Sequence, residues 1–333
     1  MKTVILCDNS YHAKTVFTKK VLSRLMTVSD LDGVCYTKKE LYSDAERFKD
    51  TEVIFSTWGM PYLSEEEIDS LLPALKCVFY AAGSVQGFAR PFLNRGVRVF
   101  SAWAANAVPV AEYATAQIIL AGKDFYCQSR LGSVGRWQDA RERRGSQIGN
   151  YHKRVGLIGC GMIGSMVAKR LKAFDVEVLA YDPFLSSERA NELGVSTVTL
   201  SELFSCCEVV SNHLANNEST KRLLGYERFM SMPPYSVFIN TGRGAQVDEE
   251  GLCRALKERP DLSAVLDVTE PEPPVEGHPF YKLENCFLTP HIAGSLGNEL
   301  ARMSEYMALE YESFVSGGAC RYEITLEMLK TMA

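Results

Sequence analysis

The sequence lacks the features that mark membrane proteins, nucleic-acid-binding proteins and zinc proteins. Its 333 residues contain no apolar run of about 18 residues, the length that a membrane-spanning helix needs. No run of basic residues occurs, and a net charge of −5 at pH 7 argues against a nucleic-acid partner, because nucleic-acid-binding surfaces are basic. The ten cysteines form no C-x-x-C pair, the spacing typical of zinc sites and redox dithiols. We therefore expect no membrane, no nucleic acid and no metal.

The N-terminal apolar run is also short, because Asp8 interrupts it before it reaches the length of a signal peptide. Most cysteines lie inside apolar stretches, where cysteine behaves as a small hydrophobic residue. These two observations predict a cytoplasmic protein with reduced thiols. A hydrophobic content of 46% is ordinary for a globular protein, and the length predicts two domains of roughly 100–200 residues each.

The most informative segment is residues 155–182. An apolar run typical of a buried strand leads into G-x-G-x-x-G, formed by Gly159, Gly161 and Gly164, and a helical pattern follows over residues 162–174. The first glycine permits a tight turn, the second lets the backbone approach a pyrophosphate, and the third lets the helix pack closely on the strand. The positive end of the helix dipole would meet the phosphate charge.

A second apolar run, residues 176–181, ends in Asp182, which follows Gly164 by 18 residues. A carboxylate about 20 residues after the glycines is typical of the group that binds the ribose of a dinucleotide. A negative charge there would repel a 2′-phosphate, so the pattern favours NAD over NADP. The alternative is a plain strand–turn–helix. The order of strand, helix, second strand and acid favours the dinucleotide site.

Strands alternate with helices along the rest of the chain, which predicts parallel, doubly wound sheets. The other expected strands are residues 3–7, 52–56, 76–81, 97–100, 208–212, 236–240, 264–267 and 286–289. The other expected helices include residues 38–48, 64–72, 106–123 and 297–316. Pro109 is tolerable only in the first turn of its helix. The Gly-rich, basic residues 132–149 are expected to form a solvated loop.

Three polar residues follow predicted strand ends, where open α/β sheets bind ligands. Arg243, between two glycines, could clamp a carboxylate bidentately. His291 suits proton exchange with a carbonyl or hydroxyl, and a neighbouring carboxylate would keep it protonated. Glu272, in a Pro-rich loop past the strand that ends at Asp267, is a candidate carboxylate, and Glu270 is equally eligible. Each of these residues alone could be an ordinary surface side chain, and His213, which also follows a strand, is the second choice of histidine.

Together these segments resemble the D-isomer-specific 2-hydroxyacid dehydrogenases. The matching pieces are N-A-V-P-V-A-E (106–112), V-G-L-I-G-C-G-M-I-G (155–164), I-N-T-G-R-G-A-Q-V-D-E-E-G-L (239–252), L-D-V-T-E-P-E-P (266–273) and L-T-P-H-I-A-G-S (288–295). They span most of residues 80–320 in the family's order, and the last three are specific to it. The resemblance implies an NAD(H)-dependent oxidoreductase that interconverts a small 2-oxo acid and the D-2-hydroxy acid.

The resemblance also implies a role for each matching residue. Arg243 binds the substrate's carboxylate and carbonyl, His291 is the acid/base, and Glu272 orients His291. Asp267 contacts the nicotinamide side of the cofactor. The implied cofactor-binding residues are Gly159, Gly161, Met162, Ile163, Gly164, Asp182, Thr241, Asp267 and Gly294. The implied substrate-binding residues are Ala82, Gly83, Ser84, Asn106 and Arg243.

The chain departs from the family pattern at two places. Val85, followed by Gln86, stands where the substrate loop usually has Asp, and Ala215 stands where Pro usually follows His213 by two residues. These departures concern the choice of substrate. A dehydrogenase of a small oxyanion such as phosphite is therefore an alternative, as is a non-catalytic NAD-sensing regulator. Formate is disfavoured, because formate dehydrogenases carry Gln at the position of Glu272.

Alternation and resemblance together predict an α/β fold with two doubly wound parallel-sheet domains. Residues 102–299 form a Rossmann NAD-binding domain inserted into a flavodoxin-like substrate-binding domain, residues 1–101 plus 300–333. The tail 321–333 is expected to pack back on the first part of the chain, and no regulatory domain is expected after it. The resemblance also implies a homodimer formed through the cofactor domain.

Overall fold

The computed structural model describes residues 1–143 and 149–330, and the chain forms two compact units. Unit 1 consists of Met1–Ala107 and Ser295–Ala333, and unit 2 is Val108–Gly294. The boundaries predicted from the sequence, 101/102 and 299/300, lie a few residues away from these. Each unit is a sheet covered by helices on both faces.

Unit 1 is built on a six-stranded sheet, sheet A, in the order β13-β5-β4-β3-β1-β2. Its strands are β1 (Lys2–Leu6), β2 (Asp30–Tyr36), β3 (Val53–Ser56), β4 (Cys77–Tyr80), β5 (Arg98–Ser101) and β13 (Glu323–Ile324). All neighbours are parallel except β13, which pairs antiparallel with β5. The first five strands thus follow the flavodoxin-like order 2-1-3-4-5. The tail packs on unit 1 through β13, and its last three residues lie outside the described ones.

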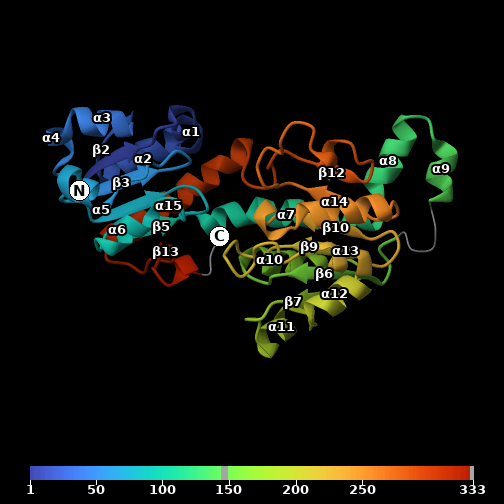
Figure 1. Ribbon diagram of the computed structural model, residues 1–333. Helices are drawn as coiled ribbons and strands as arrows, with labels where there is room; N and C mark the ends of the chain where they lie inside the picture. The colour runs from blue at the N-terminus through green and yellow to red at the C-terminus, as the bar shows by residue number, and fades with distance from the viewer. Residues whose placement is uncertain (144–148, 331–333) are drawn as a thin grey trace. The chain divides into compact units, whose positions relative to one another are not determined.

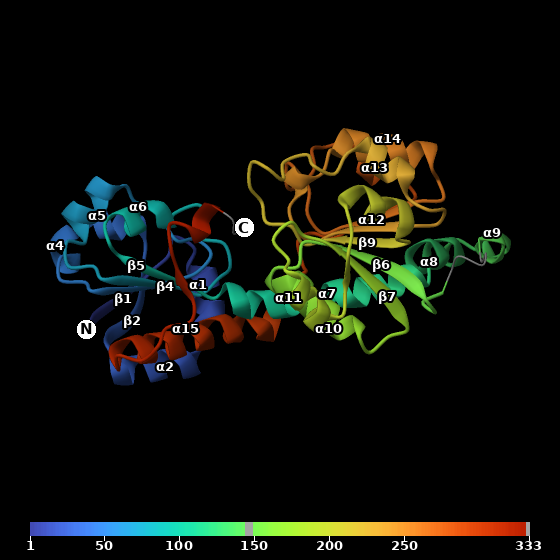
Figure 2. The ribbon, with the colours of Figure 1, turned by 90° about the horizontal axis from the view of Figure 1, so that it is seen from below.

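Helices cover both faces of sheet A (Figures 1 and 2). One face carries α1 (Ser10–Val16), α2 (Lys19–Val28) and α15 (Leu300–Val315), with η3 (Gly297–Glu299) leading into α15. The other carries α3 (Lys38–Ser43), α4 (Ala45–Phe48), α5 (Glu65–Leu71), α6 (Ala89–Asn94) and η4 (Met328–Lys330). Phe79 stacks on Phe100 at 4.6 Å, and Tyr311 of α15 meets Phe79 edge-on at 5.4 Å. Because such rings bury large areas, this aromatic layer holds α15 on the sheet.

Unit 2 is built on a seven-stranded parallel sheet, sheet B, in the order β12-β11-β10-β9-β6-β7-β8. Its strands are β6 (Lys153–Ile158), β7 (Val176–Tyr181), β8 (Ser196–Thr197), β9 (Val209–Asn212), β10 (Val237–Asn240), β11 (Ser263–Leu266) and β12 (Cys286–Leu288). This is the Rossmann order 3-2-1-4-5-6 with one further strand. The strand order reverses between β6 and β9, and ligands bind open α/β sheets at the carboxyl ends beside such a point.

Helices also cover both faces of sheet B, as Figure 2 shows. One face carries α12 (Leu200–Cys206), α13 (Tyr226–Ser231) and α14 (Glu249–Glu258), and the other carries α7 (Trp103–Gly122), α10 (Met162–Leu171) and α11 (Ser187–Leu193). The remaining helices are α8 (Phe125–Ser133), α9 (Trp137–Glu142), η1 (Gly244–Gln246) and η2 (Pro279–Tyr281). The two doubly wound sheets confirm the predicted fold class.

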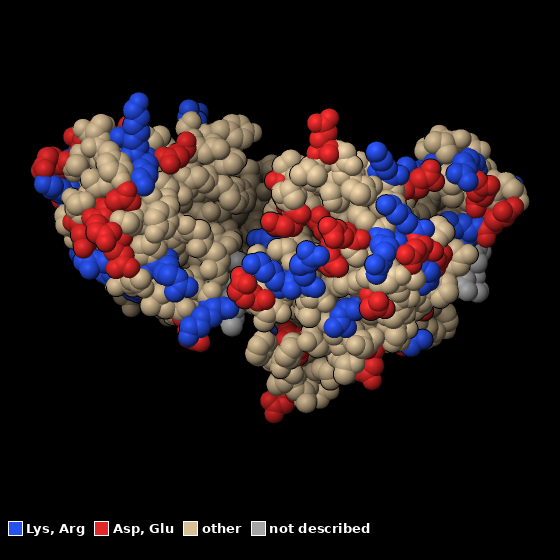
Figure 3. Space-filling view, viewed as in Figure 1, with Lys and Arg blue, Asp and Glu red and all other residues tan. Residues whose placement is uncertain are grey.

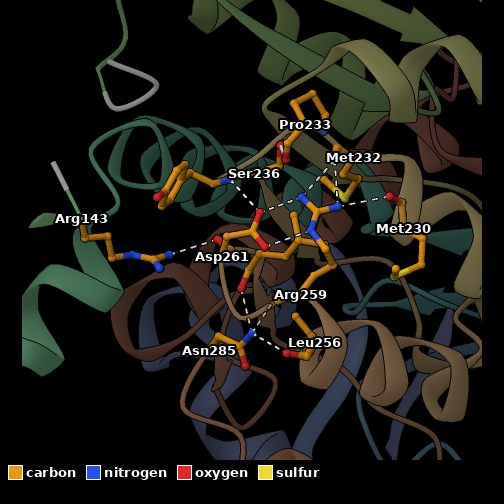
Figure 4. A network of polar contacts seen from close by, with 11 residues as sticks. Arg143, Met230, Met232, Pro233, Ser236, Leu256, Arg259, Asp261 and Asn285 are labelled. Atoms are coloured by element: carbon orange, nitrogen blue, oxygen red, sulfur yellow. Dashed lines mark hydrogen bonds and ion pairs between the residues drawn. The ribbon is translucent and has the colours of Figure 1, made fainter. Parts of the chain in front are cut away.

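A polar cluster fixes the amino ends of the last strands of sheet B (Figure 4). Arg259 donates to both carboxylate oxygens of Asp261, at 2.9 and 2.6 Å, and to two backbone carbonyls at the end of α13. Asn285 donates to the carbonyls of Leu256 and Leu262 at 2.9 and 2.8 Å. This polar cluster lies at the amino ends of the strands, away from the carboxyl ends where ligands bind. Its role is therefore to stabilise the folded unit.

Four local expectations were wrong. The helix over residues 106–123 starts earlier, so Pro109 lies inside α7 and not in its first turn. The chain stays helical there because buried alanines, Ala107 and Ala111, pack on both sides of the proline. Residues 132–149 contain helix α9, with residues 144–148 outside the described ones. Asp44 divides the expected helix over residues 38–48.

Strand β2 was not expected at all. Its residues D-L-D-G-V-C-Y are exposed at Asp30, Asp32 and Val34 and buried or half-buried elsewhere, and Gly33 lowers the strand propensity. Among the described residues, no helix combines the length and apolar character needed to span a membrane. Lysines and arginines intermingle with acidic side chains on the face drawn in Figure 3.

Candidate active site

The turn between β6 and α10 needs each of its outer glycines. Gly159 has φ +89°, and a Cβ there would lie 2.9 Å from the carbonyl oxygen of His213. A Cβ on Gly164 would lie 2.0 Å from the carbonyl oxygen of Gly159. The first glycine therefore permits the turn, and the second permits α10 to pack against it.

Gly161 is different, because a Cβ on it would meet no heavy atom within 4 Å. It is the N-cap of α10 and offers no side chain to cap the first-turn N–H groups, which include those of Met162 and Ile163. Unsatisfied donors and the positive end of a helix dipole suit an anionic group. This open cradle is where the pyrophosphate of a dinucleotide fits.

Asp182 follows β7 and braces the same turn. Its Oδ2 accepts a hydrogen bond from the backbone N–H of Cys160 at 2.7 Å, and its Oδ1 accepts from Phe184 at 2.9 Å. The carboxylate is thus fixed beside the glycine turn, at the position expected for a ribose ligand.

Two alanine variants test this turn. Gly161→Ala adds a methyl group to open space, so we expect its melting temperature to stay close to that of the wild type while NADH affinity falls about tenfold or more, about 1.4 kcal/mol. Gly164→Ala forces a methyl group into backbone and should lose about 3 kcal/mol of stability or more. Thermal denaturation and NADH fluorescence titration measure both. Unchanged NADH affinity in a folded Gly161→Ala protein would rule out the cradle.

Arg243 sits in a tight turn after β10. Its Nη1 donates to the carbonyl of Gly242 at 2.7 Å. Burial lowers the pKa of the Arg243 guanidinium, and the charge of Glu272 opposes this shift. A Cβ on Gly244 would lie 2.0 Å from the carbonyl carbon of Thr269, so the Arg243 turn packs directly on the segment that leads to Glu272.

His291 and Glu272 form an ion-pair contact: Nδ1 of the imidazole lies 2.6 Å from Oε1 of the carboxylate. His291 has φ +53°, and its backbone N–H donates to the carbonyl of Asp267 at 3.0 Å. Its Nε2 makes no hydrogen bond within the described part of the chain, which leaves that atom available to a substrate. Glu270 is the other eligible carboxylate. Its backbone N–H donates a hydrogen bond to Oε1 of Glu249 at 2.8 Å.

Asp267 fixes the loop that carries His291. The Asp267 side chain is 2% exposed, and it accepts hydrogen bonds from Thr289 Oγ1 at 2.6 Å and from the backbone N–H groups of Ile292 and Ala293 at 2.8 and 2.9 Å. Thr289 Oγ1 in turn lies 3.0 Å from the hydroxyl of Tyr113. Gly294 follows this loop directly.

His213, the second choice of histidine, is held differently. Thr241 Oγ1 lies 3.4 Å from its Nδ1, and Ser211 Oγ lies 3.0 Å from its Nε2. Burial lowers the pKa of His213 to about 4, so the ring is neutral at physiological pH. A neutral imidazole is a much weaker acid than the imidazolium ion, so His213 is the weaker candidate for the general acid.

A cavity of about 360 Å³ lies beside the His291–Glu272 pair. Apolar side chains, among them Pro273, Tyr281 and Leu288, form much of its wall, and Asp267 contributes to it. The His291 and Glu272 side chains are 47% and 39% exposed, so both are accessible to a substrate. Among the described residues, no group of three or more His, Cys, Asp or Glu side chains is placed to hold a metal ion.

Glu249, the first residue of α14, holds the start of the loop that presents Glu272. Its Oε1 accepts the hydrogen bond from the Glu270 backbone, and its side chain is 12% exposed. Burial raises the pKa of Glu249 to about 7, and the charge of Glu270 adds to the shift. His278 Nε2 lies 3.7 Å from the other carboxylate oxygen of Glu249.

This raised pKa predicts a pH-dependent stability. From its ordinary value of 4.5 up to about 7, native Glu249 keeps a proton that the unfolded chain has released, so its contribution to the free energy of unfolding falls as pH rises. Glu249→Gln should therefore gain about 1 kcal/mol on the wild type between about pH 5 and pH 8. Urea denaturation at both pH values measures the gain. The exposed neighbour variant Glu250→Gln is the control, and an equal response of both variants would contradict the prediction.

The predicted substrate loop lies in unit 1. Ser101 Oγ donates to the carbonyls of Ala82 and Gly83 at 2.9 and 2.6 Å, which leaves Ser84 exposed. Asn106 Oδ1 accepts from the backbone N–H of Ser295 at 3.0 Å. A Cβ on Gly83 would lie 3.5 Å from Asn106 Nδ2, so the loop and Asn106 are neighbours.

The residues at the two departures from the family pattern have the following contacts. Val85 is fully buried in the core of unit 1, and Gln86 donates to the carbonyl of Leu329 at 2.8 Å. The carbonyl of Ala215 accepts a hydrogen bond from Gln246 at 3.0 Å.

Sequence reasoning missed the residues that hold the site together. They are Tyr113, Thr289, Glu249 and the buried amides of Asn212, Asn240 and Gln246. Both asparagines end predicted strands, close to the point where the strand order of sheet B reverses. That position could have marked them as residues near a ligand site. Nothing local marks Tyr113 or Glu249, because their partners lie far away in the chain.

A family model described as "D-isomer specific 2-hydroxyacid dehydrogenase, NAD binding domain" matches residues 116–293. D-3-phosphoglycerate dehydrogenase of Archaeoglobus fulgidus is 34% identical over 71% of this chain and 44% of its own length. Glyoxylate reductase of Korarchaeum cryptofilum is 32% identical over 82% of each chain. The match to D-3-phosphoglycerate dehydrogenase of Methanocaldococcus jannaschii covers 53% of that protein, so this chain spans about half the length of such relatives. The structure of Rhodotorula graminis D-mandelate dehydrogenase shares the fold, with a TM-score of 0.83 over 97% of each chain at 21% identity.

Proposed function

Because this chain belongs to the D-isomer-specific 2-hydroxyacid dehydrogenases, we propose that it interconverts a small 2-oxo acid and the D-2-hydroxy acid with NAD(H). The observation that carries the proposal is the 2.6 Å contact between His291 and Glu272, next to the turn of Arg243. All three lie at the carboxyl ends of strands in the sheet that also bears the glycine turn.

In the reduction, His291 donates a proton from Nε2 to the carbonyl oxygen of the substrate. Glu272, hydrogen-bonded to Nδ1, fixes the orientation of the ring so that Nε2 faces the substrate. In the oxidation, the same Nε2 takes the proton from the hydroxyl group. Asp267 keeps His291 in place through the backbone bonds of the residues that follow it.

Arg243 anchors the carboxylate of the substrate and polarises its carbonyl group. A guanidinium presents two parallel N–H donors to a carboxylate, and its partial burial makes this interaction stronger than at a surface. The same charge stabilises the negative oxygen that develops at the substrate's C2.

The glycine turn binds the cofactor. The family uses NAD(H), and the open space at Gly161, with the N–H groups of Met162 and Ile163, fits its pyrophosphate. Asp182 accepts from the ribose hydroxyls and disfavours a 2′-phosphate. When bound, NADH supplies the hydride that reduces C2.

Further roles complete the proposal. Thr241, Asp267 and Gly294 contact the cofactor, and the backbone amides of residues 82–84 with Asn106 contact the carboxylate of the substrate. These residue roles rest on the family's pattern at the matching positions.

The proposal also includes a cytoplasmic homodimer.

A panel of substrates tests the proposed function. NADH oxidation is followed with glyoxylate, hydroxypyruvate, phosphohydroxypyruvate and longer 2-oxo acids, and NAD reduction is followed with phosphite. Turnover of at least one 2-oxo acid, and none of phosphite, is expected. Turnover of phosphite alone would establish the oxyanion alternative. Tight NADH binding without any turnover would establish a sensor.

A further inference from the structure

Three buried side-chain amides lie next to the Arg243 turn. Asn212 ends β9, Asn240 ends β10 and Gln246 ends η1, and each is at most 1% exposed. Asn212 and Asn240 are directly opposite in the β9–β10 register. Nδ2 of Asn212 donates to Oδ1 of Asn240 at 3.0 Å and to Oε1 of Gln246 at 2.7 Å. The three amides thus form one network.

The network holds the backbone on both sides of Arg243. Oε1 of Gln246 accepts from the backbone N–H of Arg243 at 3.0 Å. Asn240 accepts from the backbone N–H of Gly242 at 3.0 Å and donates to the carbonyl of Arg243 at 3.1 Å. Both backbone polar groups of Arg243 are therefore satisfied by side-chain amides, which take the place of a neighbouring strand.

Gln246 also ties this turn to the segment after β9. Its Nε2 donates to the carbonyls of Leu214 and Ala215 at 2.9 and 3.0 Å. Because Oε1 meets two N–H donors and Nε2 meets two carbonyls, the opposite orientation of the amide would lose all four bonds. The Gln246 side chain therefore has one acceptable placement.

Close packing transmits that placement to Arg243. A Cβ on Gly242 would lie 2.5 Å from Oε1 of Gln246, and a Cβ on Gly244 would contact the backbone of Thr269. The Gln246 amide is therefore one wall of the turn that holds Arg243, and replacing it removes both that wall and the hydrogen bond to the Arg243 backbone. A displacement of about 1 Å in a reacting group can cost roughly 10²-fold in rate.

We propose that Gln246, supported by Asn212, is a positioning residue that sets where Arg243 meets the substrate. This inference rests on the proposed function, because the position of Arg243 matters to turnover only if Arg243 binds the substrate. Gln246 touches neither substrate nor cofactor in this account, and it acts only through the Arg243 backbone.

The test compares Gln246→Met with Asn285→Leu at saturating NADH. Asn285 is the matched control, a buried amide that donates to two backbone carbonyls at the opposite edge of the same sheet. We expect both variants to have a lower melting temperature than the wild type. With rates normalised to the concentration of folded protein, kcat/KM for the 2-oxo acid should fall about 10–100-fold in Gln246→Met, through a higher KM and a lower kcat. In Asn285→Leu it should stay within about twofold of the wild-type value.

A double-mutant cycle identifies the route. In the Gln246→Met background, Arg243→Ala should cost at least tenfold less in kcat/KM than it does in the wild type, because Arg243 is already displaced. If Gln246→Met does not fold, Asn212→Leu replaces it. This variant removes the bonds that Asn212 makes with Gln246, Asn240 and Leu214, and it leaves the bond that the Arg243 backbone N–H donates to Oε1 of Gln246. In Asn212→Leu we expect kcat/KM to fall as well, by less than in Gln246→Met.

Two outcomes overturn the inference: Gln246→Met behaves like Asn285→Leu, or Arg243→Ala costs the same in both backgrounds. In either case a large effect of Arg243→Ala in the wild type would leave the proposed function intact. Failure of the proposed function is distinct, because the wild type would then reduce no 2-oxo acid.

Discussion

Replacing Arg243 by alanine is expected to lower kcat/KM for the 2-oxo acid by about 10²–10³-fold and to leave NADH affinity nearly unchanged. The guanidinium is partly buried, and burial lowers its pKa, so a substrate carboxylate meets a charge that water screens poorly. Removing that charge weakens both the anchoring of the substrate and the stabilisation of its developing oxyanion. Steady-state kinetics at saturating NADH and an NADH titration measure the two effects separately.

Arg189→Ala is the matched control for this variant. Arg189 is an exposed arginine of α11 in the same unit, paired with Glu192 three residues later at 2.6 Å. Its loss should change kcat/KM by less than about twofold, since an exposed pair contributes little. Near wild-type turnover by Arg243→Ala would remove Arg243 from the site. A parallel loss of NADH affinity would instead place Arg243 in the cofactor site.

Replacing His291 by asparagine should lower kcat by about 10²–10⁴-fold, the usual contribution of a positioned acid or base. Asparagine tolerates the φ of +53° found at this position, so the variant tests chemistry rather than folding. Glu272→Gln keeps a partner for Nδ1 but loses the charge, and a smaller fall of about 10–100-fold is expected. The pH profile of kcat in each variant reports which protonation step has been lost.

A second histidine–glutamate contact provides the control for this pair. His152 has φ +52°, and its Nδ1 lies 3.9 Å from Glu177 at an exposed position. His152→Asn should leave kcat unchanged, because that contact lies outside the proposed site. Equal activities of His291→Asn and His152→Asn would exclude His291 as the acid.

The candidate site residues at strand ends could be predicted from the sequence. The residues that hydrogen-bond to them and fix their positions could not. The G-x-G-x-x-G turn could be predicted because each glycine answers a local need, a positive φ at Gly159 and close packing at Gly164. The pairing of His291 with Glu272 came from the family resemblance. Spacing alone left Glu270 equally eligible, and only the folded loop separates the two carboxylates.

What could not be predicted depends on tertiary contacts. Gln246 and Asn212 read as ordinary loop and strand-end residues, since nothing in the sequence shows that their amides meet at 2.7 Å. Pro109 was placed in a first turn because local rules forbid it further inside a helix, yet the packing of buried alanines outweighs the lost hydrogen bond. Strand β2 was missed because Asp30, Asp32 and Gly33 interrupt its apolar residues.

The central claim is that these residues direct hydride transfer from NADH to C2 of a 2-oxo acid. The most direct measurement uses NADH deuterated at the transferring position, a 2-oxo acid from the panel, and mass spectrometry with chiral chromatography of the product. We expect one deuterium at C2 of the D-2-hydroxy acid for each NADH oxidised. A product without deuterium at C2, or an L-configured product, would contradict the account.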